Sequence, residues 1–236
     1  MVKRQAIDVI GIDEISEFWD VLTEDQKAYL QANITLHHYK KNELIHSEGE
    51  IPTHMMILVR GKVKIYKAGV GGRSQIMRML KPYEYFGYRA IFAANGYKGY
   101  NTNARAFEAC SIYLIPADVI SNLLKENAML AFSFLQRLAV DLGASDAKIV
   151  SLTQKHIRGR LAEALLFLKD NYGLEEDGAT INIYLAREDI ANLSNMTTSN
   201  AIRTLSTFAG EKLIALDGRK IKIIDVEKLH KISRMG

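Results

Sequence analysis

The sequence changes character abruptly near residue 117, and this change constrains the fold more than any other feature. Between 37 and 116, short runs of Ile, Val, Tyr and Met are interrupted by glycines, which favour tight turns. Within that stretch Val63 and Ile65 alternate with lysines, a period-two pattern that predicts a strand with one buried face. From 117 to 153 there is one glycine, no proline and many strong helix formers. The chain is therefore predicted to form an antiparallel sandwich or barrel followed by a long helix.

Apolar side chains recur along the predicted long helix at alternating spacings of three and four residues. This is the heptad pattern through which one helix pairs with another. We expect pairing with the same helix of a second chain, and packing of the helix on its own sheet is the alternative interpretation. The predicted dimer interface consists of Leu135, Leu138, Leu142, Ser145, Ile149 and Leu152, in which Ser145 is the single polar member.

A helix-turn-helix pattern lies after residue 186. Apolar residues at 190, 193, 196, 201, 205 and 208 can form one core if a short turn joins two helices. Thr197 is a suitable N-cap for the second helix. Packing through 201, 205 and 208 turns outward the side chains of Thr198, Ser199, Ile202, Arg203 and Ser206. Because Arg203 can donate two hydrogen bonds to a guanine edge, the pattern predicts contact with double-stranded DNA.

A hairpin is predicted directly after this pair of helices. Asp217-Gly218 lies between two alternating apolar runs, which is typical of a tight turn. Arg219, Lys220 and Lys222 place positive charge at its tip and along one edge, which suits contact with the DNA backbone. The expected DNA-binding residues are Arg187, Thr197, Thr198, Ser199, Asn200, Arg203, Ser206, Arg219 and Lys220.

Composition narrows the class of protein. The formal net charge of +4 and the pI of about 9.0 are compatible with an anionic partner. The single cysteine, Cys110, excludes an internal disulfide, and its apolar neighbours predict a buried thiol. No apolar run is long enough to span a bilayer and the start lacks a secretion signal, so a cytoplasmic location is expected. We find no nucleophile–base pair or metal motif, so no catalytic residue or metal ligand is expected.

The order of these elements, together with local motifs, resembles the Crp/Fnr family of bacterial transcription factors. Residues 43–50 and 58–63 look like the family's first two β-roll turns, and 85–92 looks like its phosphate-binding cassette. The DNA half resembles the family from Arg158 to the hairpin, so the likeness covers nearly the whole chain. Separately these motifs are loose, but in this order they are strongly specific.

The resemblance implies an α+β protein. Its parts are an N-terminal antiparallel β-roll that is jelly-roll-like, a long dimerisation helix and a C-terminal winged helix-turn-helix. The implied sensor domain spans 1–134, the dimerisation helix 117–153 and the DNA-binding domain 154–236.

The sensor half departs from the cyclic-AMP-binding members of the family. Those members carry a Glu after the cassette glycine and, further on, an Arg-Ser pair. Here Tyr88 stands at the Glu position and Tyr100-Asn101 at the Arg-Ser position. No cation remains at the phosphate position, so we do not expect cyclic AMP to bind in the usual way.

An unidentified small-molecule effector remains compatible with the sensor half. The tyrosines around the cassette either form an aromatic pocket for it or fill the cavity, and the sequence leaves both open. The expected effector pocket comprises Gly87, Tyr88, Arg89, Tyr100, Asn101, Thr102, Ser145 and Asp146.

The implied function is regulation of transcription by a homodimer on a palindromic DNA site, with RNA polymerase as a further partner. At the start of the second helix Ser199 replaces the family's usual Glu, whereas Arg203 matches a family residue, so the target sequence does not transfer. A regulator without a small-molecule signal, or one controlled by a protein partner, is one alternative. A regulatory subunit of an enzyme is another alternative. The predicted basic hairpin around Asp217-Gly218, which corresponds to the wing of a winged helix-turn-helix, argues against it.

Overall fold

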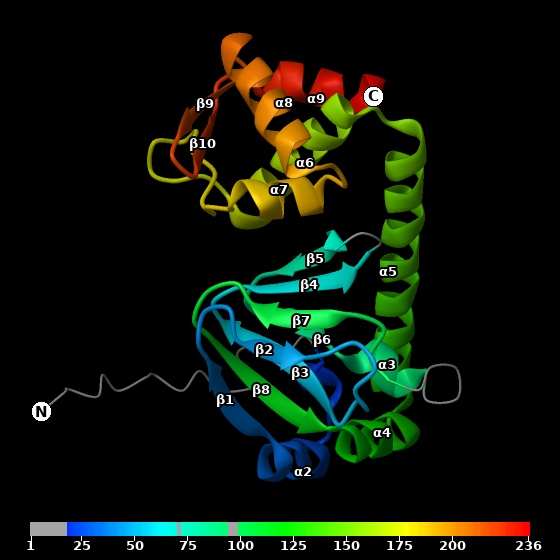
Figure 1. Ribbon diagram of the computed structural model, residues 1–236. Coiled ribbons are helices and arrows are strands. Elements are labelled where there is room, and N and C mark those ends of the chain that lie inside the picture. The colour runs from blue at the N-terminus through cyan, green and yellow to red at the C-terminus, as the bar shows by residue number, and fades with distance from the viewer. Residues whose placement is uncertain (1–17, 70–71, 94–98) are drawn as a thin grey trace, which may run out of the picture. The chain divides into compact units, whose positions relative to one another are not determined.

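The structure is a computed structural model that describes residues 18–69, 72–93 and 99–236 (Figure 1). Expectations that concern residues 1–17 lie outside this range. The chain divides into two compact units, which comprise the described parts of Met1–Ile65 with Met79–Ala139 and of Tyr66–Arg78 with Val140–Gly236. Among the described helices, none combines the length and the apolar character needed to cross a membrane. The predicted domain limits stay a prediction.

Two four-stranded sheets form the β-roll, and the pairs β1–β8, β2–β7, β3–β6 and β3–β8 are antiparallel. The first has the order β1-β8-β3-β6, with β1 at Thr35–Tyr39, β8 at Cys110–Pro116, β3 at His54–Arg60 and β6 at Tyr85–Phe86. The second has the order β2-β7-β4-β5, with β2 at Leu44–His46, β7 at Asn103–Ala106, β4 at Val63–Ala68 and β5 at Ser74–Leu80. The fold class predicted from the sequence is confirmed.

Glycine 61 makes the predicted turn between β3 and β4. Its φ of +92° is a conformation that side chains other than glycine rarely adopt. A Cβ atom at this position would also lie 2.5 Å from the backbone oxygen of Ala109. Both the backbone conformation and the lack of space for a Cβ atom therefore require glycine at this position.

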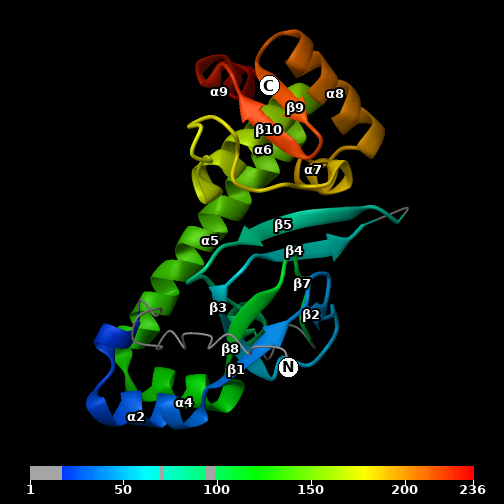
Figure 2. The ribbon, with the colours of Figure 1, turned by 90° about the vertical axis from the view of Figure 1, so that its left-hand side faces the viewer.

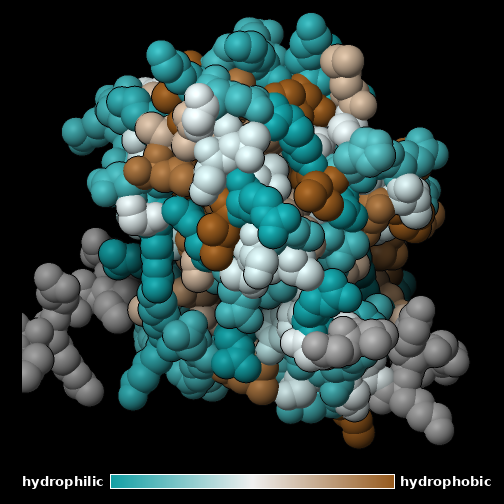
Figure 3. All heavy atoms as spheres, turned by 45° about the horizontal axis from the view of Figure 1, so that its top comes forward, coloured by the Kyte–Doolittle hydropathy of each residue, from teal (hydrophilic) through white to brown (hydrophobic). Residues whose placement is uncertain are grey.

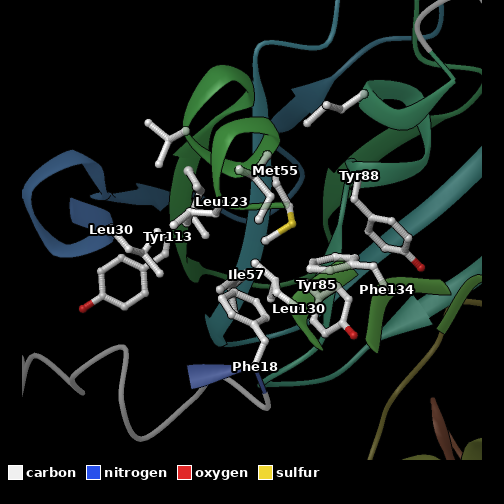
Figure 4. Close-up of a cluster of buried hydrophobic side chains, with 14 of the residues drawn as sticks. Phe18, Leu30, Met55, Ile57, Tyr85, Tyr88, Tyr113, Leu123, Leu130 and Phe134 are labelled. Carbon is white, nitrogen blue, oxygen red and sulfur yellow. The ribbon is translucent and has the colours of Figure 1, made fainter. Parts of the chain in front are cut away.

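Alternation along β3 and β8 creates two apolar cores, one on each face of the first sheet. Met56 and Leu58 of β3 point between the two sheets, into a core shared with Val63 and Ala104 of the second sheet. Met55 and Ile57 point to the opposite face, where a second core gathers side chains from several helices (Figure 4). Buried Cys110 belongs to the core between the sheets, as predicted, and burial raises the pKa of its thiol to about 12.

Helices cover the outer face of the first sheet. They are η1 at Trp19–Val21, α2 at Glu24–Asn33, α3 at Tyr88–Phe92, α4 at Ala117–Glu126 and the start of α5 at Ala128–Gln154. Figure 2 shows α2 beside α4, which it contacts. The stretch 117–153 thus forms two helices where one was expected. Asn127 separates them because its side chain accepts a hydrogen bond from Leu130 N at 2.9 Å, as an N-cap does.

The C-terminal region consists of four helices and a hairpin. Their bounds are α6 at Ile157–Tyr172, α7 at Arg187–Leu193, α8 at Thr198–Gly210, β9 at Ile214–Asp217, β10 at Lys220–Ile223 and α9 at Val226–Met235. Ile181 and Ile183 lie between α6 and α7 and belong to no strand. Leu174 forms an isolated bridge with Ile181, and Ile181 N donates to Ile221 O of β10 at 2.9 Å.

Candidate nucleic-acid interface

The turn between α7 and α8 is short and fixed by backbone contacts. Ser194 Oγ donates to Ile190 O at 2.6 Å, and Met196 N donates to Ala191 O at 3.0 Å. Between them Asn195 adopts a φ of +50°, a conformation that asparagine tolerates better than most residues. The six apolar residues predicted to form the core of this motif are all buried: Ile190, Leu193, Met196, Ala201, Leu205 and Phe208. The predicted helix-turn-helix is therefore confirmed.

Thr197 caps the N-terminus of α8, as predicted. Its hydroxyl oxygen accepts a hydrogen bond from Asn200 N at 3.2 Å, which satisfies one of the otherwise unpaired amides of the first turn. The first turn carries no acidic residue. Free amides and the positive end of the helix dipole, flanked by Thr198 and Ser199, form a favourable place for a phosphate oxygen.

The outer face of α8 is polar and exposed. The predicted outward residues Thr198, Ser199, Ile202, Arg203 and Ser206 are all exposed, and Asn200 is half-buried. The guanidinium of Arg203 makes no hydrogen bond or ion pair with the described part of the chain. Figure 3 shows one face of the molecule, where hydrophilic residues predominate and apolar ones form separate spots. The polar groups of α8 are thus available to an external partner, as the sequence predicted.

Arg187 differs from the other predicted DNA-binding residues because the protein itself uses its side chain. Its Nη2 donates to the backbone oxygen of Gly218 at 2.7 Å, and its Nη1 is buried without a hydrogen-bond partner. Gly218 lies in the predicted tight turn, whose strands pair Asp217 with Lys220. Arg187 therefore holds the start of α7 to the tip of the wing, and direct contact with DNA stays a prediction.

The basic side chains of the wing are not equally available. Lys220 Nζ lies 3.0 Å from Glu175 Oε2, and Lys222 Nζ lies 3.2 Å from Asp177 Oδ2. Arg219 is exposed. Neither of these two ion pairs was predicted from the sequence. A possible signal was the acidic run of residues 175–177, which lies between α6 and α7.

Tyr184 completes this network. Its hydroxyl donates to Glu175, and Lys220 Nζ lies 5.2 Å from the centre of its ring. Hydrogen bonds from Tyr184 and from Lys220 lower the pKa of the Glu175 carboxyl. Hydrogen bonds from the backbone amides of Thr180 and Ala179 lower the pKa of Asp177. Both carboxylates are therefore charged at neutral pH and form ion pairs with the two lysines.

Partly buried polar side chains connect α5 to α6 and α7. Lys148 Nζ donates to Leu193 O, at the C-terminal end of α7, at 3.2 Å. Burial is the largest cause lowering the pKa of Lys148. Near the end of α5, Ser151 donates a hydrogen bond to Glu163, and Lys155 Nζ lies 3.4 Å from another oxygen of the same carboxylate. The end of α5 is thus held against both α6 and α7.

The residues of the predicted dimer interface on α5 are partly exposed and partly covered by their own chain. Leu135, Leu142 and Ile149 are 60%, 64% and 59% exposed. Leu138 packs against the core of its own unit, and Leu152 is half-buried. Ser145 is exposed, and its hydroxyl donates to Asp141 O at 2.8 Å. Phe132 is not part of the predicted dimer interface but is 53% exposed. The row of exposed apolar side chains therefore begins about one helical turn before Leu135, the first residue of the predicted interface.

In the sensor half, the tyrosine at the family's Glu position belongs to an aromatic core. Tyr88 is fully buried, with its ring centre 5.4 Å from that of Tyr85 and 5.8 Å from that of Phe134 (Figure 4). Its ring therefore fills space on the helical side of the first sheet.

The tyrosine at the family's Arg position fills the core between the sheets. Tyr100 stacks on His46 with ring centres 3.8 Å apart, and its hydroxyl donates to His54 O at 3.2 Å. A Cβ atom on Gly87 would lie 2.7 Å from the terminal methyl of Met56 and 3.7 Å from the Tyr100 ring. Space beside the cassette glycine is thus occupied by the protein's own side chains.

The remaining expected pocket residues occupy exposed or half-buried positions. Arg89 and Asn101 are exposed, and Thr102 is half-buried. Ser145 and Asp146 are exposed on the part of α5 that belongs to the other unit. Of the tyrosines near the cassette, Tyr83 is 50% exposed, and Tyr97 lies outside the described residues. The effector pocket as a whole stays a prediction.

His46 is a buried polar residue that the sequence analysis did not single out. It is 5% exposed, and its Nδ1 has no hydrogen-bond partner. Burial lowers the pKa of its imidazole to about 4, so the ring is neutral at physiological pH. Its signal in the sequence is slight, because a lone histidine in a short strand is also compatible with a surface position.

Two family models match the chain. A model of the cyclic nucleotide-binding domain matches residues 36–127, and a model of the Crp-like helix-turn-helix domain matches residues 159–232. The first covers most of the β-roll, and the second covers the region from α6 to α9.

Curated relatives extend over most of the chain. The CRP-like cAMP-activated global transcriptional regulator of Mycobacterium tuberculosis is 26% identical over 197 residues, which is 83% of this chain and 87% of the relative. The global nitrogen regulator of a Nostoc species is 24% identical over 186 residues, which is 78% of this chain and 83% of the relative. Among solved structures, a transcriptional regulator of the Crp/Fnr family from Eubacterium rectale superposes with a TM-score of 0.77 at 22% identity, covering 92% of this chain and 98% of that one.

Proposed function

This chain belongs to the Crp/Fnr family of DNA-binding transcriptional regulators, and we propose that it acts as a homodimer whose two α8 helices bind a palindromic DNA site. The observation that carries the proposal is the outer face of α8. Hydroxyl groups and an unpaired arginine lie exposed on a helix whose opposite face is anchored by Ala201, Leu205 and Phe208.

Base recognition is assigned to Arg203. Its planar guanidinium can donate two parallel hydrogen bonds to the O6 and N7 atoms of guanine in the major groove. The capped N-terminus of α8 and the exposed Arg219 then contact phosphates, which set the register of the helix but carry no sequence information. The remaining expected contacts, from Ser206 and Asn200, support the same orientation.

Dimerisation is assigned to α5. Among the exposed apolar side chains of α5, those at 132, 135, 142 and 149 follow spacings of three and seven residues, so these four lie along one side of the helix. A stripe of this kind is stabilised when a second copy covers it. Pairing through α5 would present two α8 helices to successive half-sites about one DNA turn apart.

The β-roll does not bind cyclic AMP in the usual way under this proposal. Tyr88 and Tyr100 stand where the family resemblance places a ribose-binding Glu and a phosphate-binding Arg, and both rings are buried in apolar cores. The protein then acts in the cytoplasm, contacts RNA polymerase and performs no catalysis. Its signal is another small molecule, or it acts without one or through a protein partner.

Selection from a randomised duplex pool at stated salt tests the proposal. We expect a palindromic consensus with half-sites about one helical turn apart, and a mass of two chains by sedimentation. A Leu142→Asp variant should sediment as a monomer and lose most of its affinity for the full site, whereas Leu138→Ile, at a position that packs on its own core, should remain dimeric. Enrichment of no sequence, or of single half-sites bound by a monomer, would refute the proposal.

Calorimetry with cyclic AMP addresses the sensor half. No heat of binding is expected at millimolar nucleotide, and tight binding would show that the buried tyrosines rearrange to admit it.

A further inference from the structure

Ile202 is the one large apolar side chain on the exposed face of α8. It is 48% exposed, and its neighbours on that face are Thr198, Ser199, Arg203 and Ser206. The apolar side chains that anchor the helix lie on the opposite face and are fully buried. Ile202 therefore contributes little to the core of its own domain.

A lone exposed isoleucine is common in proteins and by itself carries no inference. The position of Ile202 distinguishes it, since the residue next to it is Arg203, to which base recognition is assigned. The side chain is also branched at Cβ, so in a helix it is restricted to few χ1 rotamers. Ile202 thus holds its methyl groups in a nearly fixed position beside the arginine.

The major groove of DNA offers one apolar group among its base edges, the 5-methyl group of thymine. Apart from the small C5–H group of cytosine, the other groups at the edge are hydrogen-bond donors and acceptors, and burying these against isoleucine would leave them unpaired. We propose that Ile202 is a specificity-determining residue that packs against the 5-methyl group of a thymine in the half-site read by Arg203. This inference rests on the proposed function, because it requires α8 to enter the major groove.

Uracil provides a direct test, because it differs from thymine only by the missing methyl group and keeps every hydrogen bond. The probe is the duplex selected from the randomised pool, with each thymine replaced in turn by deoxyuridine. At one position per half-site we expect wild-type affinity to fall about threefold to fivefold, the effect of one buried methyl group. In the Ile202→Ala variant the same replacement should have no effect, while the base preference due to Arg203 remains.

Two further arms separate this role from a general effect on binding. Ile224, on the short segment after β10, is 55% exposed and supplies a matched control, since Ile224→Ala should keep the full uracil penalty. At the sensitive position, cytosine should bind weakly, and 5-methylcytosine should recover part of the lost affinity.

The outcomes distinguish the inference from the proposed function. A protein that selects a palindromic site but tolerates uracil at every position overturns the role of Ile202 alone, as does a uracil penalty that persists in Ile202→Ala. A protein that selects no DNA refutes the proposed function, and the inference falls with it. Thermal unfolding of both alanine variants should match the wild type, because neither side chain is buried.

Discussion

The interior of the β-roll and the outer face of α8 relate differently to the family pattern. In the β-roll, the positions that the resemblance assigns to nucleotide contacts hold Tyr88 and Tyr100, and both rings are buried in the protein's own cores. On α8, the predicted polar groups stay exposed, and the guanidinium of Arg203 makes no hydrogen bond or ion pair with the described part of the chain. Both regions keep the fold of the family, but only the outer face of α8 presents exposed polar side chains that a partner could contact.

The contrast shows that a family scaffold does not fix what a site binds. A side chain that fills an interior contributes to the free energy of folding, whereas one that faces solvent contributes to the free energy of binding. Truncations in the two regions should therefore separate cleanly into effects on stability and effects on DNA affinity.

Tyr100→Ala should have the largest effect on stability. The substitution removes a buried ring from the core between the sheets, its stacking on His46 and its hydrogen bond to His54 O. Truncation of a buried aromatic residue costs about 3–5 kcal/mol, which urea unfolding monitored by circular dichroism would measure. The base preference of the fraction that remains folded should not change.

Tyr100→Phe is the matched control, because it keeps the ring and loses only the hydroxyl, at a cost of about 1 kcal/mol. If Tyr100→Ala unfolds at the wild-type urea midpoint, the ring does not support the core and the contrast between the two regions fails.

Acid should destabilise the sensor half through His46. In the unfolded chain the imidazole titrates near its ordinary pKa of 6.5, whereas burial lowers the pKa in the folded chain to about 4. The unfolded state therefore binds the proton more readily between these values, and stability falls as the pH drops from 6.5 toward 4. The full loss attributable to this group is about 3 kcal/mol.

Carboxylates titrate in the same range, so the informative quantity is a difference between proteins. His46→Phe keeps a ring against Tyr100 and removes the titrating group, and its stability should fall less steeply with acid than that of the wild type. If the free energy of unfolding falls equally steeply with acid in both proteins, protonation of His46 does not contribute to the loss of stability.

Arg203→Ala should show the reverse pattern, with affinity affected and stability spared. Loss of a two-hydrogen-bond contact to guanine costs about 1–3 kcal/mol of base discrimination. Because the side chain is exposed, the free energy of unfolding should change by no more than about 0.5 kcal/mol.

Arg203→Lys keeps the charge but not the planar pair of donors, so it should retain phosphate attraction and lose base preference. Fluorescence anisotropy on the selected duplex and on single-base variants measures both properties. Wild-type base preference in Arg203→Ala would remove this residue from base recognition.

Sequence patterns predicted the elements that depend on local chemistry. The helix-turn-helix core, the Thr197 cap and the turn at Asp217-Gly218 follow from apolar spacing and from residues with strong positional preferences, and the structure confirms all three. The break at Asn127 was missed. Its N-cap hydrogen bond from Leu130 N is local, but the same side chain is also held by its amide, which donates to Val21 O and Gln26 Oε1, about a hundred positions away in the sequence.

Contacts of this long-range kind also decide which charges are available. The lysines of the wing appear free in the sequence because their acidic partners lie more than forty residues earlier. The burial of His46 against Tyr100 likewise joins strand β2 to the segment that precedes β7, and no local pattern connects the two. Local sequence patterns indicate secondary-structure propensity and amphipathic faces. Which side chains pair across the fold can be determined only from the three-dimensional structure.

The smallest expected effect concerns the wing. There Lys220 is paired with the protein's own carboxylate, whereas Arg219 is exposed. Glu175→Gln should raise DNA affinity about twofold to fivefold at low salt, because it removes the carboxylate that holds Lys220 and frees that lysine for a phosphate. Affinity should also fall more steeply with salt, since one more counterion is released on binding.

Glu176→Gln makes this prediction specific. Glu176 lies in the same loop and carries the same charge, but it is exposed and has no lysine partner among the described residues. Both substitutions remove one negative charge from the DNA-binding domain, so long-range attraction rises equally in the two variants. Only Glu175→Gln also releases Lys220. Equal affinities and equal salt slopes for the two variants would show that the ion pair does not restrain the wing, whereas a steeper slope confined to Glu175→Gln would identify Lys220 as a phosphate contact withheld by the protein's own acidic loop.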